Sequence, residues 1–210
     1  EVKRDGRLYA QEYKRGKPSF VVKPVGKVEK DETGTSVMFS PDPEIFPEIK
    51  FDYDKILQHL RQQAYLTKAV RINVVDKRES EGVSEKQKRK EDDFSAGEIA
   101  RKYSFYFEGG VRTYVRYLNI GKKVVNPSIF YYEKAIDDSS IEVALQYTEN
   151  FKENIYSFAN TIYTVDGGTH MVGFRTSLTR AINDYARKQS YLKEKDENLT
   201  SDDAKEGLTA

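Results

Sequence analysis

The chain has 210 residues, which is the length of one large domain or two small ones. Lysine and arginine (35) almost balance aspartate and glutamate (34), so the net charge of +1 excludes a nucleic-acid module that acts through bulk positive charge. The absence of cysteine excludes disulfides, iron–sulfur sites and a thiol nucleophile, and two well-separated histidines exclude a histidine-rich metal centre. No apolar run approaches the ~20 residues of a membrane span and no signal peptide opens the sequence, so we expect a soluble cytoplasmic α+β protein without a membrane partner.

The N-terminal quarter of the chain is predicted to be β-structure. Two short alternating runs flank Asp5-Gly6, a dipeptide that favours a tight hairpin turn because both central residues of that turn need positive φ. Further extended segments are predicted over residues 20–25 and Ser36–Phe39. Three prolines then interrupt the pattern, so a domain boundary is predicted near residues 41–51.

The next part alternates predicted helices and strands. Apolar residues at three- and four-residue spacing predict a helix over 52–65, and the alternation of Val70–Val75 predicts a strand. A short helix is expected after the glycine pair at 109–110. Three more strands are predicted over Ile129–Tyr132, Ile141–Tyr147 and Ile155–Tyr163.

The clearest helix extends from Thr169 to about Arg187. Its apolar stripe consists of Met171, Phe174, Leu178, Ile182 and Tyr185. The polar stretch after this helix, 193–203, is predicted to be a mobile loop, and Ser201 is predicted to cap a further helix.

A charged segment, Lys77–Asp93, holds six basic and six acidic side chains and almost nothing apolar. It is either an interaction arm or a solvated flexible insertion between strands. This composition favours the insertion, because such a segment buries too little apolar surface to order itself.

The sequence contains no phosphate-binding loop of the Gly-x-x-x-x-Gly-Lys type and no Gly-x-Ser-x-Gly motif. The glycine pairs at 109–110 and 167–168 each precede a predicted helix, where they serve either to bind an anion or, more simply, to make a tight turn.

His170, at a helix N-terminus, is expected to be neutral and to act as a hydrogen-bonding partner or a local packing residue. The arginines of the long helix either meet phosphate groups or form an ordinary solvated face; they are Arg175, Arg180 and Arg187.

Six segments, taken in order, are more specific than the composition. They are Tyr106–Val111, Tyr117–Asn119, Ile141–Tyr147, Glu153–Asn160, Asp166–Arg175 and Asp203–Ala210. In this order they resemble the ATPase subunits of bacterial type II DNA topoisomerases, the family that contains the B subunits of DNA gyrase and of topoisomerase IV. The most specific run contains Gly167, Gly168, Thr169 and His170. The resemblance covers nearly all of the chain, with an insertion at 77–102 as its main departure.

The resemblance implies both a fold and a division of the chain. Residues 1–46 are expected to be the last strands of a GHKL (Bergerat-type) ATP-binding domain. Residues 47–210 are expected to be most of a transducer domain, which has a ribosomal-protein-like fold with a left-handed β-α-β crossover. In this family two subunits close on ATP around a DNA segment, and the transducer relays closure to the DNA gate. The implied partners are DNA, a second copy of the chain and the DNA-cleaving subunit, which is the A subunit of gyrase or the A subunit of topoisomerase IV.

The family's cofactors are ATP and magnesium, but its catalytic glutamate, magnesium-binding asparagine and γ-phosphate lysine fall outside the matched positions. We therefore expect an internal piece of the ATPase subunit. This piece is incomplete at its C-terminus, has no catalytic residue or metal site, and does not hydrolyse ATP alone.

Some family positions transfer to this sequence. By resemblance, Thr35 helps to hold the adenine through water, Val37 lines the same pocket, and Arg4 lies at the pocket mouth. Arg175 corresponds to an arginine that faces the central DNA cavity, and Arg180 and Arg187 share this basic side only roughly.

Two alternatives to an ATPase that couples ATP hydrolysis to DNA strand passage remain open. One is a nucleic-acid-binding domain that shares only the transducer fold, and the other is a different GHKL machine such as a mismatch-repair ATPase or a chaperone. The ordered set of motifs favours the topoisomerase, and the near-zero net charge argues against the first alternative.

Overall fold

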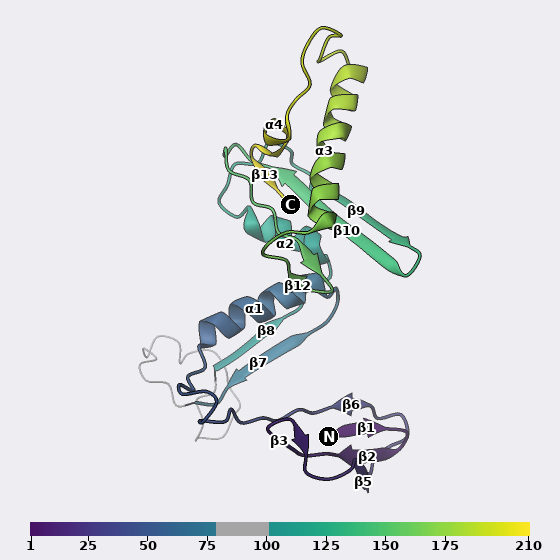
Figure 1. Ribbon diagram of the computed structural model, residues 1–210, viewed down its shortest axis with the longest axis vertical. Coiled ribbons are helices and arrows are strands. Elements are labelled where there is room, and N and C mark those ends of the chain that lie inside the picture. The colour runs from purple at the N-terminus through teal and green to yellow at the C-terminus, as the bar shows by residue number, and fades with distance from the viewer. Residues whose placement is uncertain (79–100) are drawn as a thin grey trace, which may run out of the picture. The chain divides into compact units, whose positions relative to one another are not determined.

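The computed structural model describes residues 1–78 and 101–210, and Figure 1 shows the order of their helices and strands. The predicted insertion at 77–93 lies, apart from its first two residues, outside these ranges. None of the described helices has the length and hydropathy that a bilayer crossing requires.

The described residues form two compact units, Glu1–Asp52 and Tyr53–Ala210. The division follows Asp52, a few residues beyond the predicted domain end at residue 46. Helices and strands occur together in the second unit, and so the predicted α+β class is confirmed.

The first unit contains a four-stranded antiparallel sheet in the order β5-β2-β1-β6 and a separate hairpin, β3-β4. Between β1 and β2, φ is 52° at Asp5 and 73° at Gly6, which confirms the predicted hairpin. The strands are β1 Val2–Arg4, β2 Arg7–Ala10, β3 Tyr13–Lys14, β4 Lys17–Pro18, β5 Lys23–Lys27 and β6 Gly34–Thr35.

The strand predicted over Ser36–Phe39 is wrong. Pairing between β1 and β6 ends at Thr35, and the Ser36 backbone N–H then donates to the carbonyl of Glu1, the residue before β1. The residues that follow are open to solvent, and Val37 is 81% exposed. Alternation alone does not make a strand here, because no backbone within residues 1–78 and 101–210 continues the ladder beyond Thr35.

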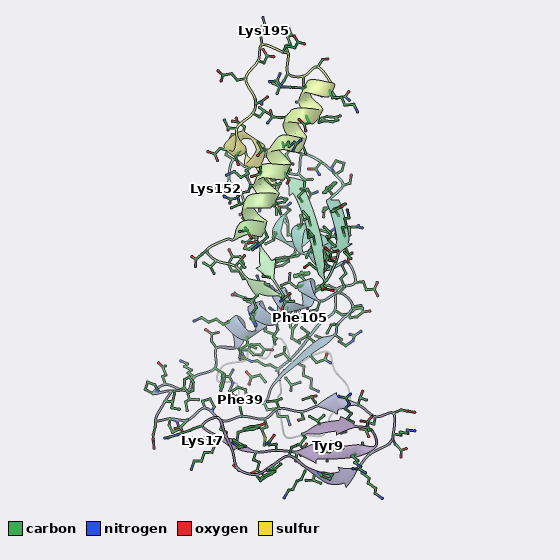
Figure 2. All side chains as sticks on the ribbon, turned by 45° about the vertical axis from the view of Figure 1, so that its right-hand side comes forward. Tyr9, Lys17, Phe39, Phe105, Lys152 and Lys195 are labelled. Carbon is green, nitrogen blue, oxygen red and sulfur yellow. The ribbon has the colours of Figure 1, made fainter. Side chains whose placement is uncertain are left out.

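The second unit begins with α1 (Tyr53–Leu66), β7 (Ile72–Asp76), β8 (Arg101–Phe105) and α2 (Gly110–Leu118). The helices predicted here and the strand at Val70–Val75 are confirmed to within a few residues. Buried aromatic rings join these elements: the Tyr65 ring stacks on Phe107 with 3.9 Å between centroids, and Phe105 is buried on β8 beside α1 (Figure 2).

The central sheet of this unit has the order β13-β10-β9, and all its pairs are antiparallel. Its strands are β9 Phe130–Ile136, β10 Ser139–Tyr147 and β13 Leu208–Thr209. Helix α2 packs on β10. Both residues of β13 have an exposed fraction of 0%, so the last strand lies in the core. The strands predicted at 129–132 and 141–147 are confirmed.

The single strand predicted over Ile155–Tyr163 is wrong. The structure has a hairpin of β11 (Phe158–Ala159) and β12 (Ile162–Tyr163) instead. Its two turn residues, Asn160 and Thr161, have φ of 48° and 69°, and this positive φ breaks the extended segment.

Helix α3 (Thr169–Lys188) confirms the predicted long helix, and a return loop, residues 189–200, leads back along it to α4 (Ser201–Lys205) (Figure 1). Tyr185, predicted in the apolar stripe, is exposed; Asn183 and Ala186 are the buried residues of this end. The cap of α4 is Thr200 rather than Ser201, and it forms a capping box with Asp203.

Candidate functional site

A groove of about 610 Å³ lies between one face of α3 and the segment that joins the return loop to α4. The α3 side chains that line it recur at helical spacing, and they are Val172, Arg175, Thr176, Thr179, Arg180, Asn183 and Asp184. The opposite wall consists of Asn198, Leu199 and Ser201. The lining therefore combines two guanidinium groups and several hydroxyls with one carboxylate, which suits a phosphate-bearing partner.

Asn183 holds the two walls of the groove together. Its side-chain amide donates to the carbonyls of Thr179 and Leu199, each at 3.0 Å, and its Oδ1 accepts from the Leu199 backbone N–H at 2.8 Å. Asn183 is not among the residues that the sequence patterns single out. The sequence does offer one indication of its role. Asn183 directly follows Ile182 of the apolar stripe, and an amide that is buried at such a position needs hydrogen-bond partners of its own.

Arg175 lies on the groove but is not free. Its Nη2 donates to Glu153 Oε1 at 3.0 Å, so Glu153 is its acidic partner. The Nε atom of Arg175 is buried and has no hydrogen-bond partner among the described residues. Glu153 was not singled out as a site residue from the sequence, because the contact joins α3 to a loop 22 residues earlier.

Arg180 is the more accessible guanidinium of the groove. Its Nε lies 3.7 Å from Asp184 Oδ2, and the two side chains are 82% and 72% exposed. Exposed pairs of this kind contribute at most about 1 kcal/mol, because water screens them. Arg180 can therefore exchange Asp184 for another anion at little cost.

Arg187 is placed differently from the other two arginines. Its guanidinium donates to the carbonyls of Lys193 (2.9 Å) and Asp196 (2.8 Å) and to the Oδ1 of Asn198 (2.6 and 3.0 Å). These bonds bind the return loop to the end of α3, and Lys195 marks the outer end of this loop (Figure 2). The structure thus does not bring Arg187 into the groove, and the loop predicted to be mobile is held at several points.

The run Gly167-Gly168-Thr169-His170 forms the turn into α3. Gly168 has φ of 153°, and a Cβ at this position would lie 2.8 Å from the His170 ring, so only glycine fits. The Nε2 of His170 lies 3.2 Å from Oγ1 of Thr164, which also donates to the Ser157 carbonyl at 3.0 Å. The motif therefore ties the start of α3 to the segment before it.

The residues expected at the adenine pocket lie on the sheet of the first unit. Thr35 pairs with Val2, two residues before Arg4, so Thr35 and Arg4 share one sheet face, whereas Val37 lies beyond the end of β6. All three residues are exposed. The described residues contain no group of three His, Cys, Asp or Glu side chains that fits a metal ion. The adenine-pocket and magnesium assignments therefore stay predictions that rest on the resemblance.

A cluster of titratable groups in the second unit shares no residue with the groove. The Nζ of Lys68, two residues after the end of α1, is 2.8 Å from Glu133 Oε2 and 2.7 Å from Glu142 Oε1. Burial raises the pKa of the neighbouring Tyr131 to about 12, and its hydrogen bond to Glu133 adds to this rise. A phenol with this pKa stays protonated at neutral pH and can donate a hydrogen bond. The cluster therefore connects the segment after α1 to the β9–β10 hairpin.

Comparisons with known proteins agree with this architecture. The family model for DNA gyrase B matches residues 110–210. The chain is 44% identical over its whole length to the DNA gyrase B subunit of Clostridium acetobutylicum and 43% identical to that of Bacillus cereus. It spans 30% and 47% of those two proteins, respectively, and thus less than half of either.

Solved structures give the same result. The 43K ATPase domain of Thermus thermophilus gyrase B, solved in complex with an aminocoumarin, matches with a TM-score of 0.73 at 31% identity. That match covers 99% of this chain and 51% of the solved chain. The topoisomerase IV ATP-binding domain of Francisella tularensis shares the fold, with a TM-score of 0.70 at 24% identity, over 99% of this chain and 50% of that one.

Fold and sequence together define the class that the chain resembles: it is similar over its whole length to part of the ATPase region of type II topoisomerases. Within this class the similarity is to DNA gyrase B, because the family model matches residues 110–210 and gyrase B subunits align with the chain from its first residue to its last.

Proposed function

We propose that this chain is the part of a DNA gyrase B-like ATPase subunit that couples ATP binding and hydrolysis to DNA strand passage. The observation that supports this most is the whole-length similarity to gyrase B proteins together with an arginine-lined groove along α3. A domain that shares only the transducer fold accounts for the groove but not for the similarity of residues 1–52 to gyrase B. Another GHKL machine does not account for the 44% identity to a gyrase B subunit over the whole chain.

The proposed nucleotide role belongs to the first unit. Thr35, Val37 and Arg4 contribute one wall of the adenine pocket, and ATP and magnesium bind in the intact protein together with further groups of that protein. The second unit acts as the transducer, with a left-handed crossover. The isolated chain is expected to show no ATP turnover, and turnover equal to that of the intact ATPase overturns this part of the proposal.

The proposed DNA role belongs to the groove. Arg175 and Arg180 contact phosphates of the DNA segment, while Arg187 has a structural role because its donors are already bound to the return loop. Such contacts are blind to sequence and sensitive to salt. The proposed partners are DNA, a second copy of the ATPase chain and the DNA-cleaving A subunit of the enzyme, all in the cytoplasm.

Arg175→Gln in the assembled enzyme tests the DNA role. We expect ATP turnover and DNA cleavage to remain and strand passage to fall, because the change removes one phosphate contact without removing core packing. DNA affinity should lose about 0.9 of a unit from its logarithmic salt slope. Lys188→Gln is the matched control, since it makes the same charge change on the same helix outside the groove. Unchanged strand passage, salt slope and thermal melting overturn the DNA role of Arg175.

A further inference from the structure

One carboxylate, that of Glu153, is shared by two cations on two different helices. Its Oε1 lies 3.0 Å from Nη2 of Arg175 on α3, and its Oε2 lies 3.4 Å from Nζ of Lys205 on α4. Lys205 also lies 2.9 Å from Asp202, and its side chain is only 13% exposed. Glu153 therefore connects the groove arginine with the segment before the last strand.

The position of Arg175 against Glu153 leaves part of its hydrogen-bonding capacity unused. A guanidinium has five N–H donors in a planar fork, and Glu153 accepts from one of them. The Nε donor is buried and has no partner among the described residues. A phosphate in the groove accepts two parallel N–H donors, so a rotated Arg175 gains a bond that it lacks beside Glu153.

The Glu153 carboxylate competes only weakly with a DNA phosphate for the Arg175 guanidinium. The side chains of Arg175 and Glu153 are both more than a third exposed, so water screens their attraction. A DNA phosphate brings the additional gain of counterion release, which a single surface carboxylate does not. Exchange of Glu153 for phosphate at Arg175 is therefore favourable at low salt.

The backbone next to Glu153 meets the end of the chain. The Asn154 N–H donates to the Leu208 carbonyl at 2.8 Å, and the Ala210 N–H donates to the Asn154 carbonyl at 3.0 Å. The side chain of Glu153 reaches α4 while its neighbour holds β13. A change at Glu153 consequently acts on both elements.

We propose that Glu153 is a positioning residue for DNA binding: it holds Arg175 in a resting position, competes with DNA phosphate for the guanidinium, and transmits its release to Lys205 and β13. This inference rests on the proposed role of the groove in binding DNA.

Glu153→Gln removes the charge of the competitor and keeps its shape. In the natural full-length protein that contains this chain, we expect this variant to bind a fluorescent DNA duplex about 3–10-fold more tightly at ~0.1 M salt, as measured by anisotropy. Glu149→Gln is the matched control, because it removes the same charge four residues earlier, where the partner is Lys123. The control should change affinity by less than about twofold, since it disturbs no groove cation.

A double-mutant cycle separates the effect of the Glu153–Arg175 contact on DNA affinity from the effect of net charge. The gain in affinity from Glu153→Gln should disappear in the Arg175→Gln background, because the guanidinium for which Glu153 and phosphate compete is then absent. Equal gains from Glu153→Gln and Glu149→Gln, or a gain that persists without Arg175, overturn the inference. If Arg175→Gln itself leaves DNA affinity and the salt slope unchanged, the proposed DNA role fails instead.

Hydrogen exchange tests the connection to the chain end. DNA should speed the exchange of the amides in α4 and β13 of the wild type, and Glu153→Gln should show the faster exchange without DNA. Glu153→Asp, which keeps the charge, should exchange at a rate nearer to the wild type. Exchange that is the same in all three proteins overturns the transmission to β13.

Discussion

The hydroxyl of Thr209 donates a 2.7 Å hydrogen bond to Oδ1 of Asn119, although the two residues lie 90 positions apart in the chain. Nδ2 of Asn119 in turn donates to Oε1 of Gln146 at 3.0 Å, and all three side chains are buried. The end of α2, the middle strand β10 and the last strand β13 are thus joined by one buried polar network. Such networks fix one arrangement of elements because every unmade bond in them is costly.

Thr209→Val tests this network. We expect a loss of about 1–3 kcal/mol in the free energy of unfolding, because Oδ1 of Asn119 loses its short donor and keeps only Lys122 Nζ at 3.4 Å. Thr209→Ser keeps the hydroxyl and removes one methyl group, so its cost should be about 1 kcal/mol. Urea unfolding of both variants gives the comparison. A valine variant as stable as the serine variant contradicts the role of the hydroxyl.

Gly207→Ala is expected to be much more destabilising than Gly121→Ala. Both glycines have positive φ, of 73° and 76°, so both changes force an L-residue into the left-handed region at about 1–2 kcal/mol. The added Cβ at Gly207 also overlaps the backbone carbonyl oxygen of Thr148, whereas at Gly121 nothing lies within 4 Å. Overpacking adds about 1–3 kcal/mol at Gly207. Equal melting temperatures for the two variants contradict this steric argument.

Arg187→Gln is expected to release the return loop without unfolding the unit. Four hydrogen bonds from the guanidinium end on this loop, and a glutamine amide replaces few of them. Cleavage of residues 189–200 in limited proteolysis should speed up by at least about tenfold, which corresponds to ~1.4 kcal/mol of local opening. Lys188→Gln should leave the cleavage rate near that of the wild type. Similar rates for the two variants contradict the role of Arg187 in holding the loop.

The capping box at α4 predicts a dependence of stability on pH. Hydrogen bonds from the hydroxyl and then the backbone N–H of Thr200 lower the pKa of Asp203 in the folded state. Its contribution is therefore complete above the unfolded pKa of about 4 and is lost as the pH falls through the lower folded value. The difference in melting temperature between the wild type and Asp203→Asn should be largest above about pH 5 and shrink in acid. A difference that grows in acid contradicts this sign.

Local patterns in the sequence predicted the main elements of this fold. The helical spacing before Leu66 and along α3, and the alternation before Tyr147, correspond to elements that bury one face. The predictions fail where the structure of a segment depends on whether another segment packs or pairs with it. Val37 alternates like a strand residue, but no strand of the described residues pairs with it. Tyr185 continues the stripe of α3 but is exposed.

The candidate site was predictable in part. Arg175 and Arg180 follow from helix position and family resemblance, and the structure places both on the groove. Glu153 and Asn183 were not found, because their roles depend on contacts with distant segments that no local pattern records. The contacts of Arg187 with the return loop were not predictable either, because a basic residue near the end of a helix looks like its neighbours in the sequence.

The burial of β13 has a consequence for synthesis of the protein. Tyr147 on β10 pairs with Leu208, so the edge of the central sheet stays open while the intervening chain is still being made. Translation at ~5–20 residues per second needs about 3–12 s for these roughly 60 residues. During that interval the nascent chain exposes the polar side chains of Asn119 and Gln146 and an unpaired strand edge. This is the period in which a chaperone that shields strand edges has most to protect.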